Sequence, residues 1–583
     1  MESPSSKQPQ QHEQLQQQQL AGMLSPFIYS SPFQIKTREG SLGSGFTIGD
    51  HHNNISDIDD LEFQENQPLL HSSTNIPKSP ADSIQLRREL FGELAEGNEN
   101  VNFKNNVKTC CTRSTSIIGL CSSINQTFRT ITTLRKPADQ CLDGFRALAA
   151  LWMLSYHVGR SFQEITPVQK WKQIGWLYQD LDAFHVALNG DMAVDIFLVL
   201  SGFLTCQSWL RQQGKQTKKT SLTTFCSTYM KYVFQRFIRL APLLYILVAL
   251  SSIFEPSLTG NPDINPCNEW WPVHIFFVSN FYMNETGFYC ARHLWYISML
   301  MQLSMLTPFI FILCKYIMKR CGSSWRVKSI VPVFLILACT AIRGAAIRES
   351  FESSSGVQGG KNHMMKILEE ETHVGYANPI CRGAPYFSGM LVFLWNYKEI
   401  DPGSTTGTTR KRTVKTICCS CCTQIIMVGL LVTMCILGVG THRTFGLRRS
   451  AWVEWVHANT DPEMHTLHAI FGRTIFGICI SYWLLIVTCE TSICGISTFL
   501  TWNGWAPIAR LSYAAYVFTY LAIYMVVPSF IMDDSDVDPD GMRVRAIFIS
   551  SYICCFIVSY LIALFFYCVV EMPVRESCRR RKK

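Results

Sequence analysis

Long apolar stretches alternate with polar segments from about residue 142 to about residue 570. One of them, FIRLAPLLYILVALSSIF, begins at Phe237. A helix needs about 20 mainly apolar residues to cross the hydrocarbon core of a bilayer, and these stretches are close to that length. The pattern predicts an all-α fold, a polytopic membrane helix bundle of about ten transmembrane helices. We expect the spans near residues 142–158, 190–210, 237–254, 293–314, 329–347, 383–397, 417–439, 467–488, 508–531 and 546–570.

The first 135 residues have a different pattern, rich in Gln, Ser, Asn and acidic residues. Such a segment cannot bury enough apolar surface to fold. We therefore expect a disordered cytosolic tail over 1–135, followed by a membrane domain over 141–577. In the tail, Glu65, Leu69 and Leu70 belong to the sequence ENQPLL. It resembles the acidic dileucine signals that sorting adaptors bind, which predicts such an adaptor as a partner and an endosomal, lysosomal or plasma membrane location.

Composition and charge fit a membrane protein. Of the 583 residues, 48% are hydrophobic and only 16% are charged, whereas a soluble domain has about 25% charged residues. The net charge is +9, but the basic residues gather in short loops between predicted spans, so we expect no nucleic-acid partner. Three basic loops and the tail RESCRRRKK follow even-numbered spans, whereas the loop at 533–541 is acidic. The positive-inside rule therefore predicts that both termini are cytosolic.

The first predicted span, CLDGFRALAALWMLSYHVGR, contains Arg146 and His157. An offset of eleven residues returns a helix to within about 20° of the same azimuth, with the two residues about 16 Å apart along the axis. Ionisable groups at membrane depth cost about 2.5 to 3.5 kcal/mol and normally face a polar cavity or a partner. Both side chains can therefore line one channel. The alternative is that Arg146 snorkels to the interface while His157 caps the far end of the helix.

The second predicted span places Asp191 and Asp195 four residues apart, with Gly202 on the same stripe. The small residue favours a close approach of span two to span one. Asp195 is then a natural partner for Arg146 or His157, because a carboxylate that orients an imidazole raises its basicity. A structural ion pair between the two helices explains the same pattern.

Two further arginines, Arg236 and Arg239, lie three residues apart on one helical face at the predicted cytosolic boundary. Paired guanidinium groups there can hold a phosphate of a ligand such as acyl coenzyme A. Anchoring to the anionic headgroups of membrane lipids is the alternative.

The loop between predicted spans three and four contains Cys267, Cys290 and the sequon that starts at Asn284. On a non-cytosolic side the two cysteines can form a disulfide, and Asn284 can accept a glycan. Two free thiols are the alternative. The chain has no HExxH motif and no Walker loop, so we expect neither a metal site nor a soluble type of chemistry.

Six sequences occur in the order LDGFRALAALWMLSYH, DIFLVLSGFL, RFIRLAP, HLWYISMLMQ, ARLSYAAYVF and EMPVRE. Together they resemble the acyltransferase-3 family of membrane proteins over residues 141–577, and the loop from Cys267 to Cys290 looks like its branch known as nose resistant to fluoxetine. The resemblance implies transfer of an acyl group, often acetyl, from acyl coenzyme A to a hydroxyl of a carbohydrate, lipid or small molecule. It also implies that the family's Arg and His pair falls on Arg146 and His157.

The sequence departs from this family at two positions. Leu300 and Met301 precede Gln302 where the family usually has an acidic residue, and Thr519 stands near the place of a histidine. We expect His157 to act as general base, a role worth about 10² to 10⁴ in rate, with Asp195 orienting it and Arg146 positioning the coenzyme. Leu300 and Thr519 favour a rival interpretation. In it the protein serves membrane transport, or the transport of a lipid or drug, and transfers no acyl group.

Overall fold

The computed structural model describes residues 129–133, 137–165, 187, 189–213, 222–259, 266–283, 290–322, 324–352, 376–396, 421–441, 462–488, 496–530 and 542–575. All regular elements within these ranges are helical. Glu65, Leu69, Leu70 and Asn284 lie outside the described residues, so the sorting signal and the glycosylation site stay predictions.

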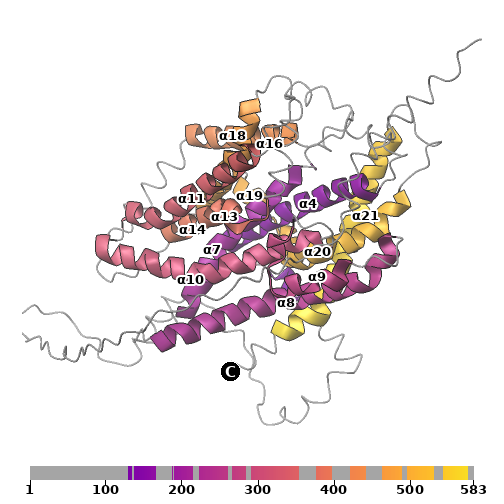
Figure 1. The fold of residues 1–583 in the computed structure, drawn as a ribbon, viewed down its shortest axis with the longest axis horizontal. Coiled ribbons are helices and arrows are strands. Elements are labelled where there is room, and N and C mark those ends of the chain that lie inside the picture. The colour runs from indigo at the N-terminus through magenta and orange to yellow at the C-terminus, as the bar shows by residue number, and fades with distance from the viewer. Residues whose placement is uncertain are drawn as a thin grey trace, which may run out of the picture. The chain divides into compact units, whose positions relative to one another are not determined.

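Each of the ten predicted spans lies on a helix, which confirms the all-α membrane bundle (Figure 1). The helices are α4 (Pro137–Ile165), α7 (Ala193–Gln213), α8 (Leu222–Thr259), α10 (Trp295–Cys321), α11 (Trp325–Glu352), α14 (Ala384–Asn396), α16 (Cys421–Thr441), α18 (Pro462–Thr488), α20 (Trp505–Val526) and α21 (Met542–Phe566). Shorter elements are α9 (Pro266–Ile275), α13 (Pro379–Arg382), α19 (Ile496–Leu500), the 3-10 turns η3 (Asn189–Met192) and η5 (Arg292–Leu294), and the π-helix η9 (Tyr567–Glu571).

Seven helical segments of the described part are long and apolar enough to cross a membrane, judged by length and composition. They correspond to α7, α8, α10, α11, α18, α20 and α21. The other three predicted spans fall on helices that are less apolar or shorter than these seven. Helix α4 carries charged residues toward both ends, α14 has 13 residues, and the apolar section of α16 is the shorter segment Thr423–Cys435.

Glycines set how closely α7 packs against its neighbours. A Cβ atom added at Gly202 would lie 2.0 Å from the carbonyl oxygen of Tyr386 in α14, and one at Gly389 of α14 would lie 1.9 Å from that of Val199 in α7. The expectation that Gly202 brings span two against span one is therefore wrong, because this glycine faces α14. The close approach to α4 is made at Gly190, where a Cβ atom would lie 2.4 Å from the carbonyl oxygen of Trp152.

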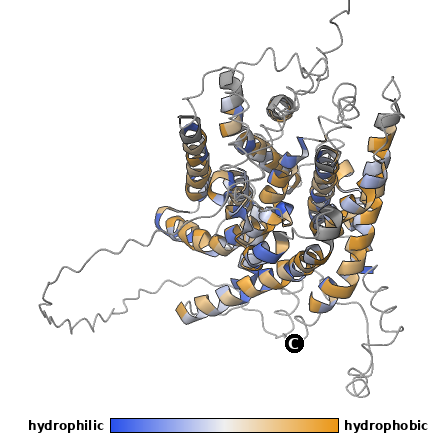
Figure 2. Cartoon of the chain, turned by 45° about the vertical axis from the view of Figure 1, so that its right-hand side comes forward, coloured by the Kyte–Doolittle hydropathy of each residue, from blue (hydrophilic) through white to orange (hydrophobic). Residues whose placement is uncertain are grey.

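Helix α21 shows how the bundle meets its surroundings. Every fourth residue on one face is a large exposed apolar side chain, and much of the helical ribbon in Figure 2 has the colour of hydrophobic residues. The opposite face carries small, fully buried residues and packs against α20 and α4. Small residues let helices approach closely in a bilayer, where large apolar side chains can face lipid. The exposed stripe is Ile549, Ile553, Ile557, Leu561 and Phe565, and the buried stripe is Ser551, Cys555, Ser559 and Ala563.

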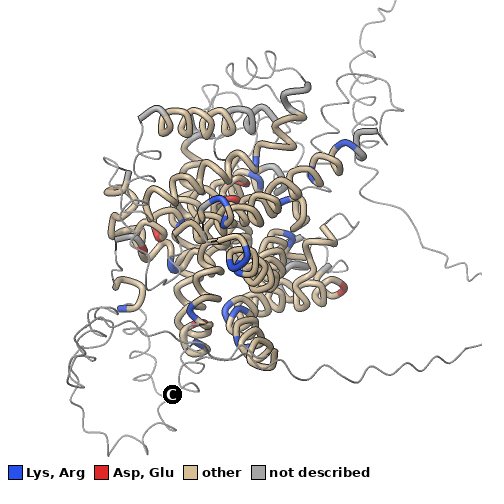
Figure 3. The backbone as a smooth tube through the Cα atoms, turned by 90° about the vertical axis from the view of Figure 1, so that its left-hand side faces the viewer, with Lys and Arg blue, Asp and Glu red and all other residues tan. Residues whose placement is uncertain are grey.

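Two features differ from or add to the expected loops. Helix α8 begins at Leu222, well before the span predicted at 237–254, so Arg236 lies within a continuous helix rather than at its boundary. Cys267 and Cys290 form a disulfide that ties α9 to the chain just before η5. Next to it, His274 Nε2 bonds to the carbonyl oxygen of Cys290 at 2.9 Å. Charged residues are sparse along the helices, as Figure 3 shows. Each buried charge therefore has a large effect on how the helices pack.

Candidate functional site

His157 lies near the C-terminal end of α4 and is only 5% exposed. Aromatic rings surround it, with centroid separations of 6.1 Å to His293, 6.0 Å to Tyr516 and 5.0 Å to Tyr520. Within the described part of the chain, no group hydrogen-bonds to its Nδ1 atom. Buried polar atoms are normally paired, and an exception calls for an explanation, such as a catalytic role or a bound water.

His293 joins this aromatic group from the start of α10. Its Nε2 atom lies 3.1 Å from the carbonyl oxygen of Val517, and its own carbonyl oxygen accepts a hydrogen bond from Tyr516. These contacts fix the ring of His293 against α20. His293, Tyr516 and Tyr520 are not predicted as site residues from the sequence, although His293 stands in the motif HLWYISMLMQ and Tyr516 in ARLSYAAYVF.

Asp195 does not pair with Arg146 or His157, so that expectation is wrong. Its Oδ1 atom accepts a hydrogen bond from Arg382 Nε at 3.1 Å, and its Oδ2 atom accepts one from Arg473 Nη1 at 3.0 Å. Both carboxylate oxygens are thus occupied at the start of α7. Two guanidinium groups compensate a fully buried carboxylate, which would otherwise be expensive to desolvate.

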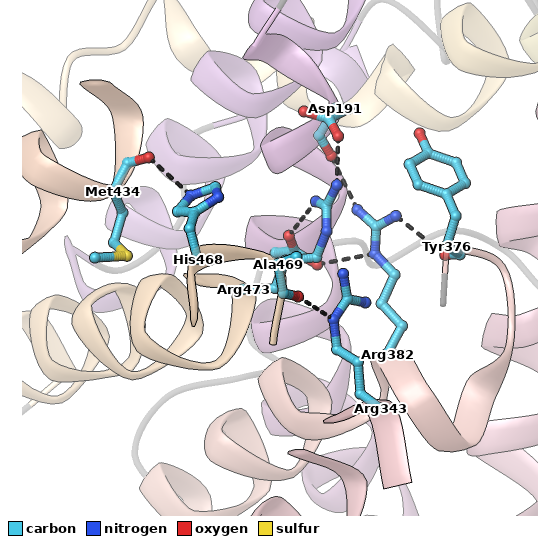
Figure 4. Close-up of polar contacts among 9 residues, drawn as sticks. Asp191, Arg343, Tyr376, Arg382, Met434, His468, Ala469 and Arg473 are labelled. Carbon is cyan, nitrogen blue, oxygen red and sulfur yellow. Dashed lines mark hydrogen bonds and ion pairs between the residues drawn. The ribbon is translucent and has the colours of Figure 1, made fainter. Parts of the chain in front are cut away.

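The same network extends to Asp191, as Figure 4 shows. Arg473 forms a second ion pair with the Asp191 carboxylate, and Arg382 Nη2 donates to the carbonyl oxygen of Asp191 at 3.0 Å. Arg382 also lies over the rings of Tyr376 and Trp295, at 4.5 and 5.1 Å from their centroids. The four charged side chains therefore tie α7, η3, α13 and α18 together as one structural unit.

Arg146 lies at the other end of the α4 face, with its side chain 20% exposed and 4.0 Å from Asp143. Arg239 of α8 is exposed and interacts electrostatically with Arg146, Arg236, Arg575 and Glu571. No hydrogen bond holds its guanidinium within the described residues. Arg236 differs, because its Nη2 atom donates to Thr205 Oγ1 of α7 at 2.9 Å. Arg239 can therefore bind an anion from outside, whereas Arg236 is held in place.

Glu571 and Arg575 belong to the same charged cluster as Arg146 and Arg239. The π-helix η9 ends at Glu571, whose carboxylate lies 3.2 Å from Arg575 Nη1. A π-helical turn often marks a functional position, because it redirects side chains that a regular helix would place elsewhere. One carboxylate among several guanidinium groups leaves the group net positive, which suits a polyanionic ligand.

The two ends of this face of α4 carry different chemical groups. An imidazole with an unpaired nitrogen stands at the His157 end, and cations that can bind an anion stand at the Arg146 end, about 16 Å away along α4. The described residues contain no group of three or more His, Cys, Asp or Glu side chains that could hold a metal ion.

Comparison with known proteins identifies one protein family. A family model described as an acyltransferase domain matches residues 139–568. The protein named regulator of hypoxia-inducible factor 1 from Caenorhabditis elegans is 26% identical over 290 residues, which cover 47% of this chain and 54% of that protein. The match thus spans about half of the relative's length. No solved structure matches the chain.

Proposed function

The chain belongs to this acyltransferase family, and from that premise we propose that it moves an acyl group, most simply acetyl, from acyl coenzyme A to a hydroxyl group. The acceptor is a lipid, a carbohydrate or a small molecule. It is an integral multi-pass membrane protein, and by its charge distribution we place both termini in the cytosol.

The observation that carries this proposal is the unpaired Nδ1 atom of His157 inside an otherwise packed bundle. A general base needs a nitrogen lone pair that no neighbouring donor occupies. In the proposed reaction the imidazole takes the proton of the acceptor hydroxyl, whose oxygen forms a bond to the thioester carbonyl carbon. The bond from that carbon to sulfur breaks, and the thiolate of coenzyme A receives the proton from His157. Asp195 takes no part, because its two oxygens are held by arginines.

The donor would be held at the opposite end of α4. Arg146 and Arg239 present guanidinium groups that suit the phosphates of coenzyme A, since charge-assisted hydrogen bonds to phosphate are short and strong. Arg239 is an exposed residue and makes no internal hydrogen bond within the described part of the chain, which supports this role. Lipid headgroups could occupy the same cations, so donor binding has to be measured directly.

Transport without acyl transfer remains the second candidate function, and two positions favour it. Leu300 packs against the apolar core, and the hydroxyl of Thr519 donates to the carbonyl oxygen of Ala515 at 2.6 Å. Neither can supply the acid or base that the family usually has there.

The decisive experiment incubates the purified protein in detergent with acetyl coenzyme A labelled in the acetyl group. We expect release or transfer of the label, and a fall of about 10²-fold or more for His157→Ala. That variant should fold normally, because the imidazole loses no hydrogen bond. An active preparation in which His157→Ala keeps the full rate would contradict the assignment, and no turnover by the intact protein would favour transport.

A further inference from the structure

A short segment just before α4 lies against the bundle, and we call these residues, 129–133, the strap. Four of its five residues are exposed, but Ile131 is only 4% exposed. Ile131 belongs to the apolar cluster that also contains Leu240 of α8, Leu511 of α20 and Tyr567 of η9. One apolar side chain therefore anchors the strap beside the helices that carry the charged cluster.

Arg510 of α20 binds the backbone of the strap. Its Nη1 atom donates to the carbonyl oxygen of Ile131 at 2.7 Å and to that of Thr130, and its Nη2 atom donates to that of Thr133. The side chain of Arg510 is only 7% exposed. Carbonyl groups at the end of a helical turn lack partners within the helix and carry partial negative charge, so a guanidinium suits them. The strap thereby holds Arg510 in one position.

Asp143 of α4 links Arg510 to Arg146. Its Oδ2 atom lies 3.9 Å from Arg510 Nη2, and its Oδ1 atom lies 4.0 Å from Arg146 Nη1. The Asp143 side chain is only 2% exposed. A buried carboxylate needs compensating charge, and here its two oxygens face two different arginines. The position of Arg146 therefore depends on Arg510 through the shared carboxylate.

The contacts continue from these residues into the charged cluster. Arg146 interacts electrostatically with Arg239. On the other side, Arg510 interacts electrostatically with Tyr567, whose hydroxyl lies 3.5 Å from Arg575 Nη1. An unbroken series of contacts thus runs from the strap to the cations proposed to bind the donor.

We propose that Arg510 is a positioning residue of the donor site. Held by the strap, it shares the carboxylate of Asp143 with Arg146 and keeps the Arg146 guanidinium where it can meet a phosphate of coenzyme A. When Asp143 pairs with Arg146 alone, its charge offsets that of Arg146, and an anionic ligand is attracted less. This inference rests on the proposed function, because it takes coenzyme A as the ligand of the cluster.

The role of Arg510 depends on its shape as well as its charge. A guanidinium is planar and presents several N–H groups in a fixed fork, so it can donate to the strap carbonyls and face Asp143 at the same time. The strap lies between residues 1–128 and α4. Donor affinity is therefore linked to whether this part of the chain stays in contact with α20.

The first test keeps the charge and changes the shape. Binding to the purified full-length protein is measured for coenzyme A and for adenosine bisphosphate, its nucleotide part. A lysine ammonium has no planar fork, so we expect Arg510→Lys to weaken binding of both ligands about 10-fold, the effect of one hydrogen bond to a charged group. Arg292→Lys is the control, because Arg292 Nη2 also donates to a carbonyl oxygen, that of Met283 at 3.0 Å, but lies at the His293 end of α10. It should change neither affinity.

The second test loosens the strap and leaves every charged residue in place. Ile131→Ser removes the apolar anchor and should weaken binding of both ligands to a similar extent, whereas Thr132→Ala, at an exposed position of the strap, should not. Hydrogen–deuterium exchange over residues 129–146 should become faster in Arg510→Lys and Ile131→Ser. Thermal unfolding checks that each variant is folded, and Ile131→Ser decides the question if Arg510→Lys does not fold. Unchanged affinity in a folded Ile131→Ser protein with a faster-exchanging strap would overturn the proposal.

Failure of the proposed function would look different. If the intact protein binds coenzyme A, loses affinity in Arg510→Lys and Ile131→Ser and yet transfers no acyl group, the positioning role stands and the enzymatic assignment falls. If the intact protein transfers acyl groups and both variants bind coenzyme A as it does, the positioning role falls alone. If the intact protein binds neither ligand, the charged cluster is no donor site and both assignments fall.

Discussion

The carboxylate of Asp195 accepts a hydrogen bond from Arg382 Nε at 3.1 Å, and neither side chain has any exposed surface. Removing one partner of a buried ion pair leaves an uncompensated charge, which costs about 3 to 5 kcal/mol. We therefore expect Asp195→Asn to lower the thermal unfolding temperature and the yield of folded protein. His157→Ala provides the contrast, since it should lower the transfer rate without this loss. An Asp195→Asn protein that is stable but inactive would return Asp195 to the catalytic group.

Donor binding separates the two arginines of α8. Arg239→Gln should raise the KM for acetyl coenzyme A about 10-fold or more, because it removes a charge-assisted contact with phosphate, and should leave stability nearly unchanged. Arg236→Gln should instead destabilise the protein, since the Arg236 side chain bonds to Thr205. Thr205→Val is the matched control for that bond. Steady-state kinetics and thermal unfolding of the three variants test this, and equal effects on KM at both arginines would contradict it.

Helix packing predicts a contrast between two glycines. Gly389→Ala would place a Cβ atom 1.9 Å from the carbonyl oxygen of Val199 and force α7 and α14 apart. Overpacking of this kind costs about 1 to 3 kcal/mol or more. Gly429→Ala in α16 meets nothing within 4 Å and should be neutral or slightly stabilising. Thermal unfolding in one detergent compares the two, and a tolerated Gly389→Ala would show that the helices can separate at no cost.

Acid should destabilise the folded protein by protonating His274. Burial lowers the pKa of His274 to about 4, despite the opposing effect of its bond to Cys290, whereas an unfolded chain titrates near about 6.5. Folding thus favours the neutral ring. The stability that depends on the neutral ring is fully present above about pH 6.5 and is lost as pH falls toward 4. The free energy of unfolding lost over this range is about 3 kcal/mol. Unfolding temperatures between about pH 7.5 and 5 should therefore fall less for His274→Gln than for the intact protein.

Membrane orientation gives the last prediction. The basic loops and the acidic segment at 533–541 predict that tags at both termini face the cytosol and that Asn284 faces the other side. Glycosidase treatment should then reduce the apparent mass, and Asn284→Gln should abolish that shift. Protease should reach the terminal tags only after the membrane is opened. A terminal tag that is cleaved on intact cells would disprove this orientation.

The helices could be predicted from the sequence because the signal is local. A run of about 20 apolar residues carries its own reason to form a spanning helix. The shared face of Arg146 and His157 is also local, since one helical period fixes both side chains. Polar partners across helices are not local. Asp195 and Arg382 are 187 positions apart, and nothing in either apolar stretch indicates which neighbouring helix each side chain meets.

The error at Gly202 has the same origin. Its small size correctly indicates a close approach, but the periodicity of one helix does not identify the partner, and α14 takes the place expected for α4. His293 was missed because it begins a span rather than interrupting one. A titratable residue at the end of an apolar run is ordinary in isolation, and its meaning depends on Tyr516 and Tyr520, more than 200 positions away.

The two stripes of α21 should diverge differently as the sequence evolves. Lipid has no fixed shape, so substitutions among Ile, Leu, Phe and Val on the outer stripe encounter no selection on size. The inner stripe of Ser551, Cys555, Ser559 and Ala563 admits only residues of similar volume, because each is fully buried in a close-packed interior. Distant homologues should therefore share the size of the inner residues even after the identity of the outer ones has been lost. Conserved volume rather than conserved letters would then be the mark of descent in this helix.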